Sequence, residues 1–597
     1  MGDAAACFLG VERSLTGRAW RERPSCGRTA LALCQRLGVP EILGRILAAR
    51  GVKVEESDGV LDPKLRALMP DPSILLDMDA GADRLAAAIV SGERIGIICD
   101  YDVDGVSSAA LLLRFLEAAG QTPLVHVPDR MTEGYGPSRK GVELLARDGA
   151  TLLVTLDCGI NATDPLTHAS ELGLDTIVVD HHLQGASLPP ARALINPNRH
   201  DDVSGLGHLC AAGVTLMLLA GANRALRKRG FWNGKTEPDL LAGLDLVALA
   251  TICDVVPLSG LNRAFVQQGL KVMSRRHNPG IAALADIARL KRLPDTHALG
   301  FLLGPRINAA GRVGHARAAL KLLTTADRGE AARMARELED LNRNRQQIEL
   351  RVLETATAEA ERLLDREGVN GLVMVAGENW HPGVLGLVAS RLVERHRLPS
   401  FALGFATGAS HAAGSGRSVP GVDLGQAVRA AAEEGLLVKG GGHPMAAGVT
   451  VDRARIGDLK AFLSERLKPV VAERASVEAL DIDGAMTAAG ATVPLIEMIE
   501  RAGPYGAGNP APVFAFPAHR VVYADLAGSD HVRVTLENDA GQRIKAIAFR
   551  ALNTELGERL LAERGRPVHV AGRLALDTWT GAKATQVIVD DVAAVAV

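Results

Sequence analysis

The sequence has few aromatic residues, no paired cysteines and no long apolar run. Aromatic residues make up only 3% of the 597 residues, so Val, Leu, Ile and Ala must supply most of the packing. The 7 cysteines are odd in number and include no C-x-x-C pair, which argues against a disulfide framework and for a reducing compartment. The longest apolar run, at 209–222, is about 14 residues, whereas a membrane-spanning helix needs about 20. With no secretory signal pattern at the N-terminus, we expect a cytoplasmic protein with no membrane partner.

Net charge is also nearly absent. The formal charge of −2 means that a nucleic-acid partner would need a local basic surface, because the overall field is too weak to attract it. The length exceeds what one hydrophobic core usually supports and predicts about three or four domains.

An alternating pattern begins near residue 90, after a helical and irregular lead-in at 1–88. Short apolar segments typical of strands alternate with segments typical of helices, which predicts a parallel, doubly wound sheet. The expected strands are 94–99, 122–127, 152–156 and 175–179, and the expected helices are 107–119, 138–147 and 162–172. A more helical stretch follows to about residue 320.

The second half of the sequence predicts three further parts. Residues 327–367 carry many charges and few breakers, which favours one long helix, or two abutting helices, that bridges two domains with a largely solvated surface. Asp327 can cap its start and Gly368 can end it. A second α/β pattern runs from 371 to about 470. Five short strands in 517–597 then predict a barrel of the OB type.

Acidic residues gather where the expected strands end. Asp180-His181-His182 follows a run rich in β-branched residues, and Asp157 follows the strand 152–156. Asp100-Tyr101-Asp102-Val103-Asp104-Gly105 places three carboxylates after another strand, and Asp254 follows an apolar segment that we also interpret as a strand. Because ligands bind outside the carboxyl ends of parallel strands, we expect the first three sites to converge. Carboxylates and imidazoles in this number suit two ions of Mn²⁺ or Mg²⁺.

Other interpretations of these residues are weaker. A calcium loop opening at Asp100 would need Glu at its twelfth position, which is Leu111 here. Cys99, Cys158 and Cys253 adjoin candidate ligands, but neighbouring residues of a strand point to opposite faces, so these thiols should face the core. A single buried Asp is more often a helix cap or a turn former, and only the four sites together favour metal.

The second α/β segment and the tail carry signals of their own. Ser415-Gly416-Arg417-Ser418 offers hydroxyls, amides and a guanidinium, which suit a phosphate, although a plain turn is equally compatible. The glycine-rich loop 440–448 lets another backbone approach closely. In the tail, Tyr523, Phe549 and Trp579 either stack on bases or fill the barrel.

Taken together, these motifs resemble those of the DHH phosphoesterase family, and within it those of the single-strand-specific DNA exonucleases. The resemblance covers about 90–597. It rests on Asp-Tyr-Asp-Val-Asp-Gly at 100, Asp157, Asp-His-His at 180, Asp-Val-Val-Pro at 254, Gly-Pro-Arg-Ile-Asn-Ala-Ala-Gly-Arg at 304, Trp-His-Pro-Gly-Val-Leu-Gly at 380, Ser-Gly-Arg-Ser at 415 and Gly-Gly-His-Pro-Met-Ala-Ala-Gly at 441.

The resemblance implies an architecture and a role for each matching residue. It implies a parallel-sheet DHH domain at 89–326, a linking helix at 327–367, a second α/β (DHHA1) domain at 368–475 and an OB-like domain at 476–597. The implied metal ligands are Asp102, Asp104, Asp157, His181, His182 and Asp254. Asp100 and Asp180 lie beside them as ligands or supporting acids, and with His182 are the implied catalytic residues. Arg130, Ser415 and Arg417 would hold the 5′ end, and Arg306, Asn308, Arg312 and His443 would contact the DNA backbone or close the site.

The implied activity is metal-assisted hydrolysis of single-stranded DNA from the 5′ end to 5′-mononucleotides, by a monomer, in DNA repair and recombination. An alternative is a phosphodiesterase for short oligonucleotides or cyclic dinucleotides, which would not need the barrel. A non-catalytic strand-binding replication factor is a further alternative, but it should have lost ligand positions, and none is lost here. The resemblance leaves open the preferred metal, and whether a single-strand-binding protein or a helicase docks.

Overall fold

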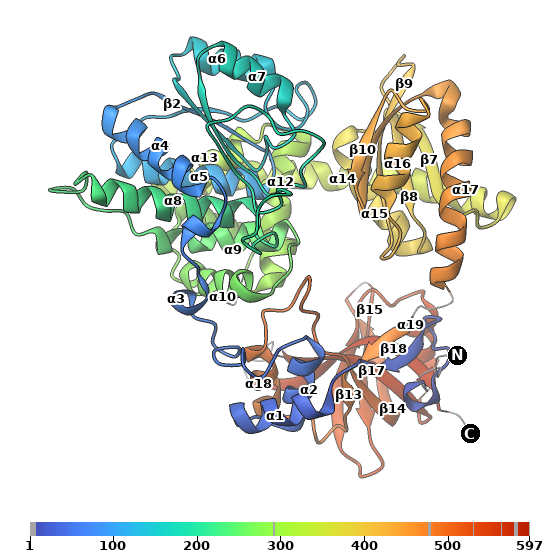
Figure 1. The fold of residues 1–597 in the computed structure, drawn as a ribbon. Coiled ribbons are helices and arrows are strands. Elements are labelled where there is room, and N and C mark those ends of the chain that lie inside the picture. Colours follow the sequence, from blue (N-terminus) through green and yellow to red (C-terminus); the bar gives the residue numbers. More distant parts are fainter. Residues whose placement is uncertain are drawn as a thin grey trace. The chain divides into compact units, whose positions relative to one another are not determined.

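The fold divides into two units that are each described by themselves (Figure 1). The computed structural model describes residues 7–290, 293–475, 479–528, 530–562, 564–577 and 583–595. One unit comprises the described parts of Met69–Val256 and Phe265–Ser476, and the other those of Met1–Leu68, Pro257–Ala264 and Val477–Val597. Among these described residues, we find no helix with the length and apolar character needed to cross a bilayer.

The first domain is built on a five-stranded parallel sheet. Its strand order is β3-β2-β4-β5-β6, and the strands are β2 (Ile95–Cys99), β3 (Leu124–His126), β4 (Leu152–Leu156), β5 (Asp175–Val179) and β6 (Ala193–Ile195). All residues of β2 and β4 are buried, as expected for parallel strands covered on both faces. The predicted sheet is therefore confirmed. Strand β6 was not predicted.

Helices cover both faces of this sheet (Figure 1). One face carries α4 (Met78–Ser91), α5 (Val103–Ala118) and α8 (Ala211–Lys228), and the other carries α6 (Arg139–Arg147) and α7 (Thr163–Glu171). Because all neighbouring strands are parallel, every carboxyl strand end lies at the same edge. The sheet therefore presents the residues that follow β2, β4 and β5 side by side.

A helical segment completes the domain and corrects one expectation. It comprises α9 (Leu244–Cys253), α10 (Gly260–Ser274), α11 (Pro279–Ile287), α12 (Gly304–Val313) and α13 (Arg317–Thr324). Asp254 was expected at the end of a strand, but it follows helix α9 and forms its C-cap. Most of α9 is buried, and a helix that is apolar on all sides shows no periodicity that separates it from a buried strand.

One helix of 40 residues, α14 (Arg328–Glu367), links this domain to the next. The Asp327 carboxylate accepts a hydrogen bond from the Glu330 amide at 2.6 Å, and Gly368 ends the helix at a φ of 69°. A buried stripe also runs along the helix, so only its outward surface is solvated.

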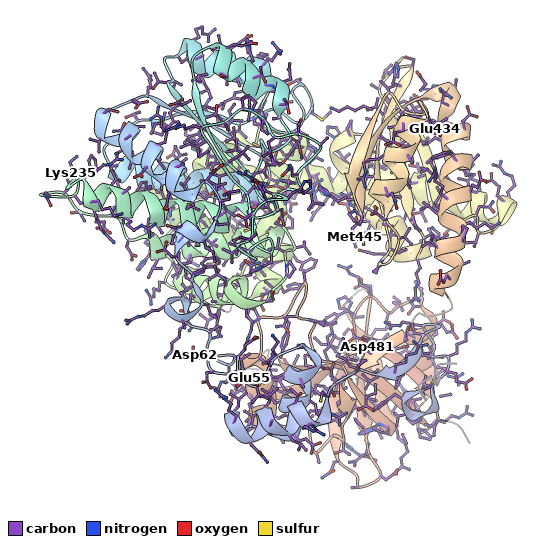
Figure 2. The ribbon with its side chains drawn as sticks, in the orientation of Figure 1. Glu55, Asp62, Lys235, Glu434, Met445 and Asp481 are labelled. Atoms are coloured by element: carbon purple, nitrogen blue, oxygen red, sulfur yellow. The ribbon has the colours of Figure 1, made fainter. Side chains whose placement is uncertain are left out.

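The second α/β domain has a five-stranded sheet in the order β10-β11-β9-β8-β7, in which only β7 and β8 are parallel. The strands are β7 (Val373–Glu378), β8 (Ser400–Phe405), β9 (His411–Arg417), β10 (Lys439–His443) and β11 (Ala446–Asp452). Its helices are α15 (Pro382–His396), α16 (Leu424–Glu433) and α17 (Ile456–Ala475). The glycine-rich loop forms β10 and the turn to β11, where Met445 is exposed (Figure 2).

The other unit contains the predicted OB-type barrel. Strands β14 (Phe514–Ala527), β15 (His531–Glu537), β16 (Arg543–Ala548), β18 (Ala584–Ala594) and β17 (Pro567–Asp577) pair in this order, and β17 closes onto β14. The short strand β13 (Gly484–Ala485) adds to β14, and α18 (Val493–Arg501) and α19 (Glu555–Ala562) complete the unit. Tyr523 and Phe549 are exposed rather than inside the barrel, and Trp579 lies outside the described residues.

The N-terminal segment packs with this barrel as far as Leu68. Strand β1 (Ala19–Glu22) pairs in parallel with β12 (Ala479–Ile482), and the Trp20 indole N–H donates to Asp591 at 3.0 Å. Helices α1 (Gly27–Leu37) and α2 (Glu41–Ala49) bury apolar side chains in the barrel core, whereas the short α3 (Leu65–Leu68) buries none. Asp481 of β12 is labelled in Figure 2. Residues 1–88, expected as one lead-in, are thus shared between the two units, because α4 packs on the parallel sheet.

Candidate active site

The carboxyl ends of three neighbouring strands bring Asp100, Asp157 and Asp180 to one edge of the parallel sheet. The Asp100 amide donates to the Leu156 carbonyl at 3.1 Å, and the Asp157 amide donates to the Val179 carbonyl at 2.9 Å. The ladder therefore continues for one residue beyond each strand and fixes the three aspartates in register. The expected convergence of these sites is confirmed.

The turn after β2 places two more carboxylates beside Asp100. Asp102 caps α5, and its Oδ1 accepts hydrogen bonds from the amides of Asp104 at 2.9 Å and Gly105 at 3.2 Å. A Cβ at Gly105 would lie 2.4 Å from the Asp100 carbonyl oxygen, so only glycine permits this close turn.

Helix α8 also points its N-terminus at the site. The Asp104 carboxylate accepts hydrogen bonds from the amides of Ala211 at 2.6 Å and Ala212 at 2.8 Å. Helix N-termini favour negative charge, so this contact helps to hold a carboxylate that is fully buried.

Imidazoles and carboxylates form one close cluster. His181 Nε2 lies 3.3 Å from Asp157 Oδ1, 3.6 Å from Asp254 Oδ2 and 3.8 Å from Asp104 Oδ2. Potential ligand atoms fall into three groups, each with its atoms within 4.8 Å of one another: Asp157, His181 and His182; Asp104, His181 and Asp254; and Asp100, Asp102 and Asp157. Asp157 and His181 each belong to two groups, as residues between two ions would.

The electrostatics of this cluster favour bound cations. Burial, and then the charges of neighbouring carboxylates, raise the pKa of Asp104 to about 7 and that of Asp254 to about 9. The same causes raise the pKa of Asp157 well above its usual value. Within the described residues, Asp157 Oδ1, Asp100 Oδ1 and His181 Nε2 are buried without a hydrogen-bond partner. Unsatisfied carboxylate and imidazole atoms at these distances fit two divalent ions of the Mn²⁺ or Mg²⁺ type.

Asp180 lies beneath the cluster and supports it. Its carboxylate accepts hydrogen bonds from the amides of Ile160 at 2.9 Å, His181 at 2.8 Å and His182 at 3.1 Å, and from His182 Nδ1 at 2.8 Å. It belongs to none of the three ligand groups. Burial opposes the charged forms of both partners, but their hydrogen bond and mutual attraction lower the pKa of Asp180 to about 2 and raise that of His182 to about 9.

Three residues that the sequence did not suggest hold the two histidines. Asn196 and Asn198 follow β6, and their side-chain amides donate to the carbonyls of His182 at 2.9 Å and His181 at 2.5 Å. Tyr135 Oη donates to the Asp157 carbonyl at 3.0 Å and lies 3.0 Å from His182 Nδ1. For Asn196 and Asn198, the only signal in the sequence was Asn-Pro-Asn after a short apolar run.

The cysteines beside the cluster are buried or half-buried. Cys99 and Cys158 are fully buried, and burial raises the pKa of both thiols. None of the three ligand groups includes a cysteine. Thiolate ligation therefore finds no support in this geometry.

Three arginines gather next to the carboxylates. The Arg130 guanidinium lies 5.0 Å from the centre of the ring of Tyr101, the residue between Asp100 and Asp102. Arg312 Nη1 donates to the Gly383 carbonyl at 3.1 Å, and Arg417 Nη1 donates to Ser415 Oγ at 2.9 Å.

Burial and the charges of neighbouring arginines lower the pKa values of Arg312 and Arg417. Burial, and then the charges of Arg130, Arg417 and Arg345, lower the pKa of Arg312 to about 10. Burial and the charge of Arg130 also lower the pKa of Arg417. Their partners named above are carbonyls, a hydroxyl and a ring rather than carboxylates, so this buried positive charge fits an anion such as a phosphate. We refer to Arg130, Arg312 and Arg417 as the arginine group.

The second domain reaches the site through two of its elements. A Cβ at Gly386 of α15 would lie 2.7 Å from Arg417 Nη2 and 3.1 Å from Ser415 Oγ, so the glycine lets this pair lie against the helix. At the end of β10, the ring of His443 lies 6.1 Å from that of His182. The structure thus brings Ser415, Arg417 and His443 to the predicted site.

Arg306 and Asn308 have structural partners. Arg306 Nε lies 2.7 Å from Glu339 Oε2 of α14, with both side chains largely buried. Asn308 Oδ1 accepts a hydrogen bond from the Val103 amide at 3.2 Å and so steadies the start of α5. Their direct contact with DNA stays a prediction.

Comparison with known proteins identifies the domains. Residues 94–251 match the model of the DHH family N-terminal domain, residues 368–469 match the DHHA1 domain, and residues 482–591 match the RecJ OB domain. These matches follow the three sheets of the structure.

Whole-chain relatives share the same order of domains. The chain is 34% identical to the single-stranded-DNA-specific exonuclease RecJ of Salmonella typhimurium, over 93% of this chain and 96% of the relative. It is 33% identical to the Escherichia coli RecJ over the same shares. The crystal structure of Thermus thermophilus RecJ in complex with Mn²⁺ superimposes with a TM-score of 0.77 at 29% identity, over 96% of this chain and 79% of that chain. The chain therefore belongs to the RecJ family of single-stranded-DNA-specific exonucleases.

Proposed function

We propose that this protein is a metal-dependent exonuclease that hydrolyses single-stranded DNA from the 5′ end to 5′-mononucleotides, in DNA repair and recombination. The observation that carries the proposal is the position of an arginine beside the turn that bears the carboxylates. Arg130 of the arginine group stacks on Tyr101, whose neighbours in sequence belong to the carboxylate cluster. A strand whose terminal phosphate is held by the arginines would place its first phosphodiester at the carboxylates.

The proposed metal ligands are those that the sequence suggested, and Asp100 joins them because it belongs to one of the three ligand groups. Divalent ions in such a site supply Lewis acidity at the scissile phosphate and a nucleophilic water at neutral pH. Asp157 and His181 each belong to two groups, so they would be the central ligands of the metal centre. Mn²⁺ and Mg²⁺ both fit this donor set.

The remaining residues orient the reaction. Asp180 accepts the Nδ1–H of His182, which leaves Nε2 for a ligand or for a proton destined for the leaving 3′ oxygen. Ser415 and Arg417 would bind the terminal phosphate and so give the strand its direction. Arg130 and Arg312 would neutralise the same phosphate from the first domain.

The domain assignment follows the same lines. We propose a catalytic domain at 89–326, a linking helix at 327–367, a DHHA1 domain at 368–475 and an OB domain at 476–597. The N-terminal elements β1, α1 and α2 pack with this OB domain. Exposed Tyr523, with the Arg533 guanidinium 6.0 Å from its ring, offers a surface on which bases can stack. This surface supports a substrate longer than a dinucleotide.

The cellular context is inferred from the substrate. A nuclease restricted to single strands needs a helicase to expose them, and a single-strand-binding protein would cover them. We infer that the protein acts in the cytoplasm as a monomer, with a helicase and a single-strand-binding protein as partners.

The test uses DNA labelled at either end. With Mn²⁺ or Mg²⁺, a long 5′-labelled single strand should release labelled mononucleotide from the first turnover, whereas a 3′-labelled strand should shorten gradually. Duplex DNA and samples with chelator should stay intact. Cleavage only of dinucleotides, or mononucleotides from the 3′ label first, would overturn the proposal.

A further inference from the structure

The buried stripe of the linking helix turns polar at its centre. Leu338 and residues N-terminal to it pack on the first domain, and residues from Val352 onward join the core of the second domain. Between them the same stripe, at a spacing of three and four residues, consists of Asn342, Arg345 and Glu349. These three residues are 3%, 9% and 9% exposed, so they are not part of the solvated surface.

The three polar residues form one hydrogen-bonded unit. Arg345 Nη2 donates to Asn342 Oδ1 at 2.6 Å, and Arg345 Nη1 donates to Glu349 Oε2. The other carboxylate oxygen of Glu349 lies 3.8 Å from Arg391 Nε, on α15 of the second domain. We refer to Asn342, Arg345 and Glu349 as the helix triad.

The helix triad lies at the junction that carries the arginine group. Helix α14 packs against α12 and α15, and Arg312 of α12 donates to the Gly383 carbonyl of α15. Arg345 is near enough to Arg312 for its charge to lower the pKa of that guanidinium. Farther along α15, Gly386 lies against Arg417. A shift of this junction would therefore move Arg417 and Ser415, which belong to the second domain, relative to the carboxylate cluster of the first.

Stability alone gives no reason for a polar unit here. Replacing a buried ion pair by apolar residues of similar size is often neutral or stabilising, and an apolar residue at each position would have continued the stripe. A planar guanidinium that donates to two separate partners, however, is held in one orientation more tightly than an apolar side chain is.

We propose that Arg345, held by Asn342 and Glu349, is a positioning residue that fixes Arg417 and Ser415 relative to the carboxylate cluster and thereby sets the length of the released product. The inference rests on the proposed function. The terminal phosphate is held at one place and the strand is cut at another, so the separation between the two decides which phosphodiester is broken. A loosened junction would let the second or third phosphodiester reach the carboxylates.

The experiment compares Arg345→Met, which keeps the volume and removes the unit, with Arg345→Lys and with Arg351→Ala. Arg351 is an exposed arginine on the same helix and serves as the matched control. Each full-length variant is given 5′-phosphorylated and 5′-hydroxyl single strands with Mn²⁺, and products are separated by length. Mn²⁺ affinity and Tm are measured in parallel.

We expect Arg345→Met to release dinucleotides and longer products and to lose at least roughly tenfold of its kcat/KM preference for the 5′-phosphate. Mn²⁺ affinity should not change, Arg345→Lys should restore part of the effect, and Arg351→Ala should match the wild type. Mononucleotide products and an unchanged end preference from folded Arg345→Met would overturn the inference, as would an equal loss on both strands with a lowered Tm. If Arg345→Met does not fold, Glu349→Gln provides the same test. A wild type that releases no mononucleotides would instead refute the proposed function.

Discussion

Binding of Mn²⁺ should release protons from the carboxylate cluster. At pH 7.5 the Asp254 carboxyl, with a pKa of about 9, still holds its proton in the metal-free protein, and Asp104, with a pKa of about 7, is partly protonated. Ions bind the ionised carboxylates only, so Asp254 and Asp104 together should release about one to two protons per chain when the site fills, and a proton held by Asp157, whose pKa is also raised, adds to this count. Replacement of Asp254 by Asn should reduce this release by about one proton.

The same pKa values give the sign of the pH dependence. Because their pKa values are raised, the Asp254 and Asp104 carboxyls hold protons in the metal-free folded chain that they lose in the unfolded chain above about pH 3.8, the ordinary pKa of Asp. Their contribution to the free energy of unfolding therefore falls as pH rises from there to about 9. Mn²⁺ takes the place of these protons, so the increase in Tm on adding Mn²⁺ should become larger as pH rises over the same range.

Isothermal titration calorimetry in buffers of different ionisation enthalpy measures the proton count directly. The full chain, stripped of metal, is titrated with MnCl₂ at pH 7.5, and the slope of apparent enthalpy against buffer enthalpy gives the protons released. Asp365→Asn, an exposed carboxylate on α14, is the matched control and should leave the count unchanged. A count of zero in the wild type, or the same count in Asp254→Asn, would refute the reasoning.

Four substitutions test the other parts of the site. Asp157→Ala or His181→Ala should lower kcat by at least roughly a thousandfold with the fold retained by circular dichroism, and near-normal turnover would remove them from the ligand set. Asp180→Asn should weaken Mn²⁺ affinity or activity by roughly 10–100-fold, because it orients His182 without joining a ligand group, and complete loss of Mn²⁺ binding would make it a ligand. Arg417→Ala should weaken the preference for a 5′-phosphate strand over a 5′-hydroxyl strand, whereas Mn²⁺ affinity stays constant; an unchanged preference would contradict its role.

The parallel sheet and its carboxylates could be predicted because local and global signals agree there. Strands such as 152–156 and 175–179 are continuous apolar runs that end in an acid, and a parallel sheet brings such ends together. Asp254 shows the limit of this reasoning. The apolar segment that precedes it is a buried helix, and only the fold shows that the C-cap of α9 lies at the same edge.

Residues that act through a long-range partner were harder to predict. Asn196 and Asn198 hold the histidine backbone across loops that have no sequence period. Arg345 and Glu349 looked like surface charges of a solvated helix, because a charged sequence alone does not reveal which face of a helix is covered. The packing of 1–68 with the barrel depends on pairing between β1 and β12, which are separated by more than 450 residues in the chain and share no local signal.

The most direct test of the account is a crystal structure of the protein with Mn²⁺ and a 5′-phosphorylated oligonucleotide that carries a nuclease-resistant linkage. The account predicts two anomalous peaks among the carboxylates, with Asp157 and His181 nearest to both. It also predicts the terminal phosphate within hydrogen-bond distance of Arg417 and Ser415, and the first phosphodiester at the metals. A 3′ end at the arginine group, or ions bound away from Asp157 and His181, would contradict it.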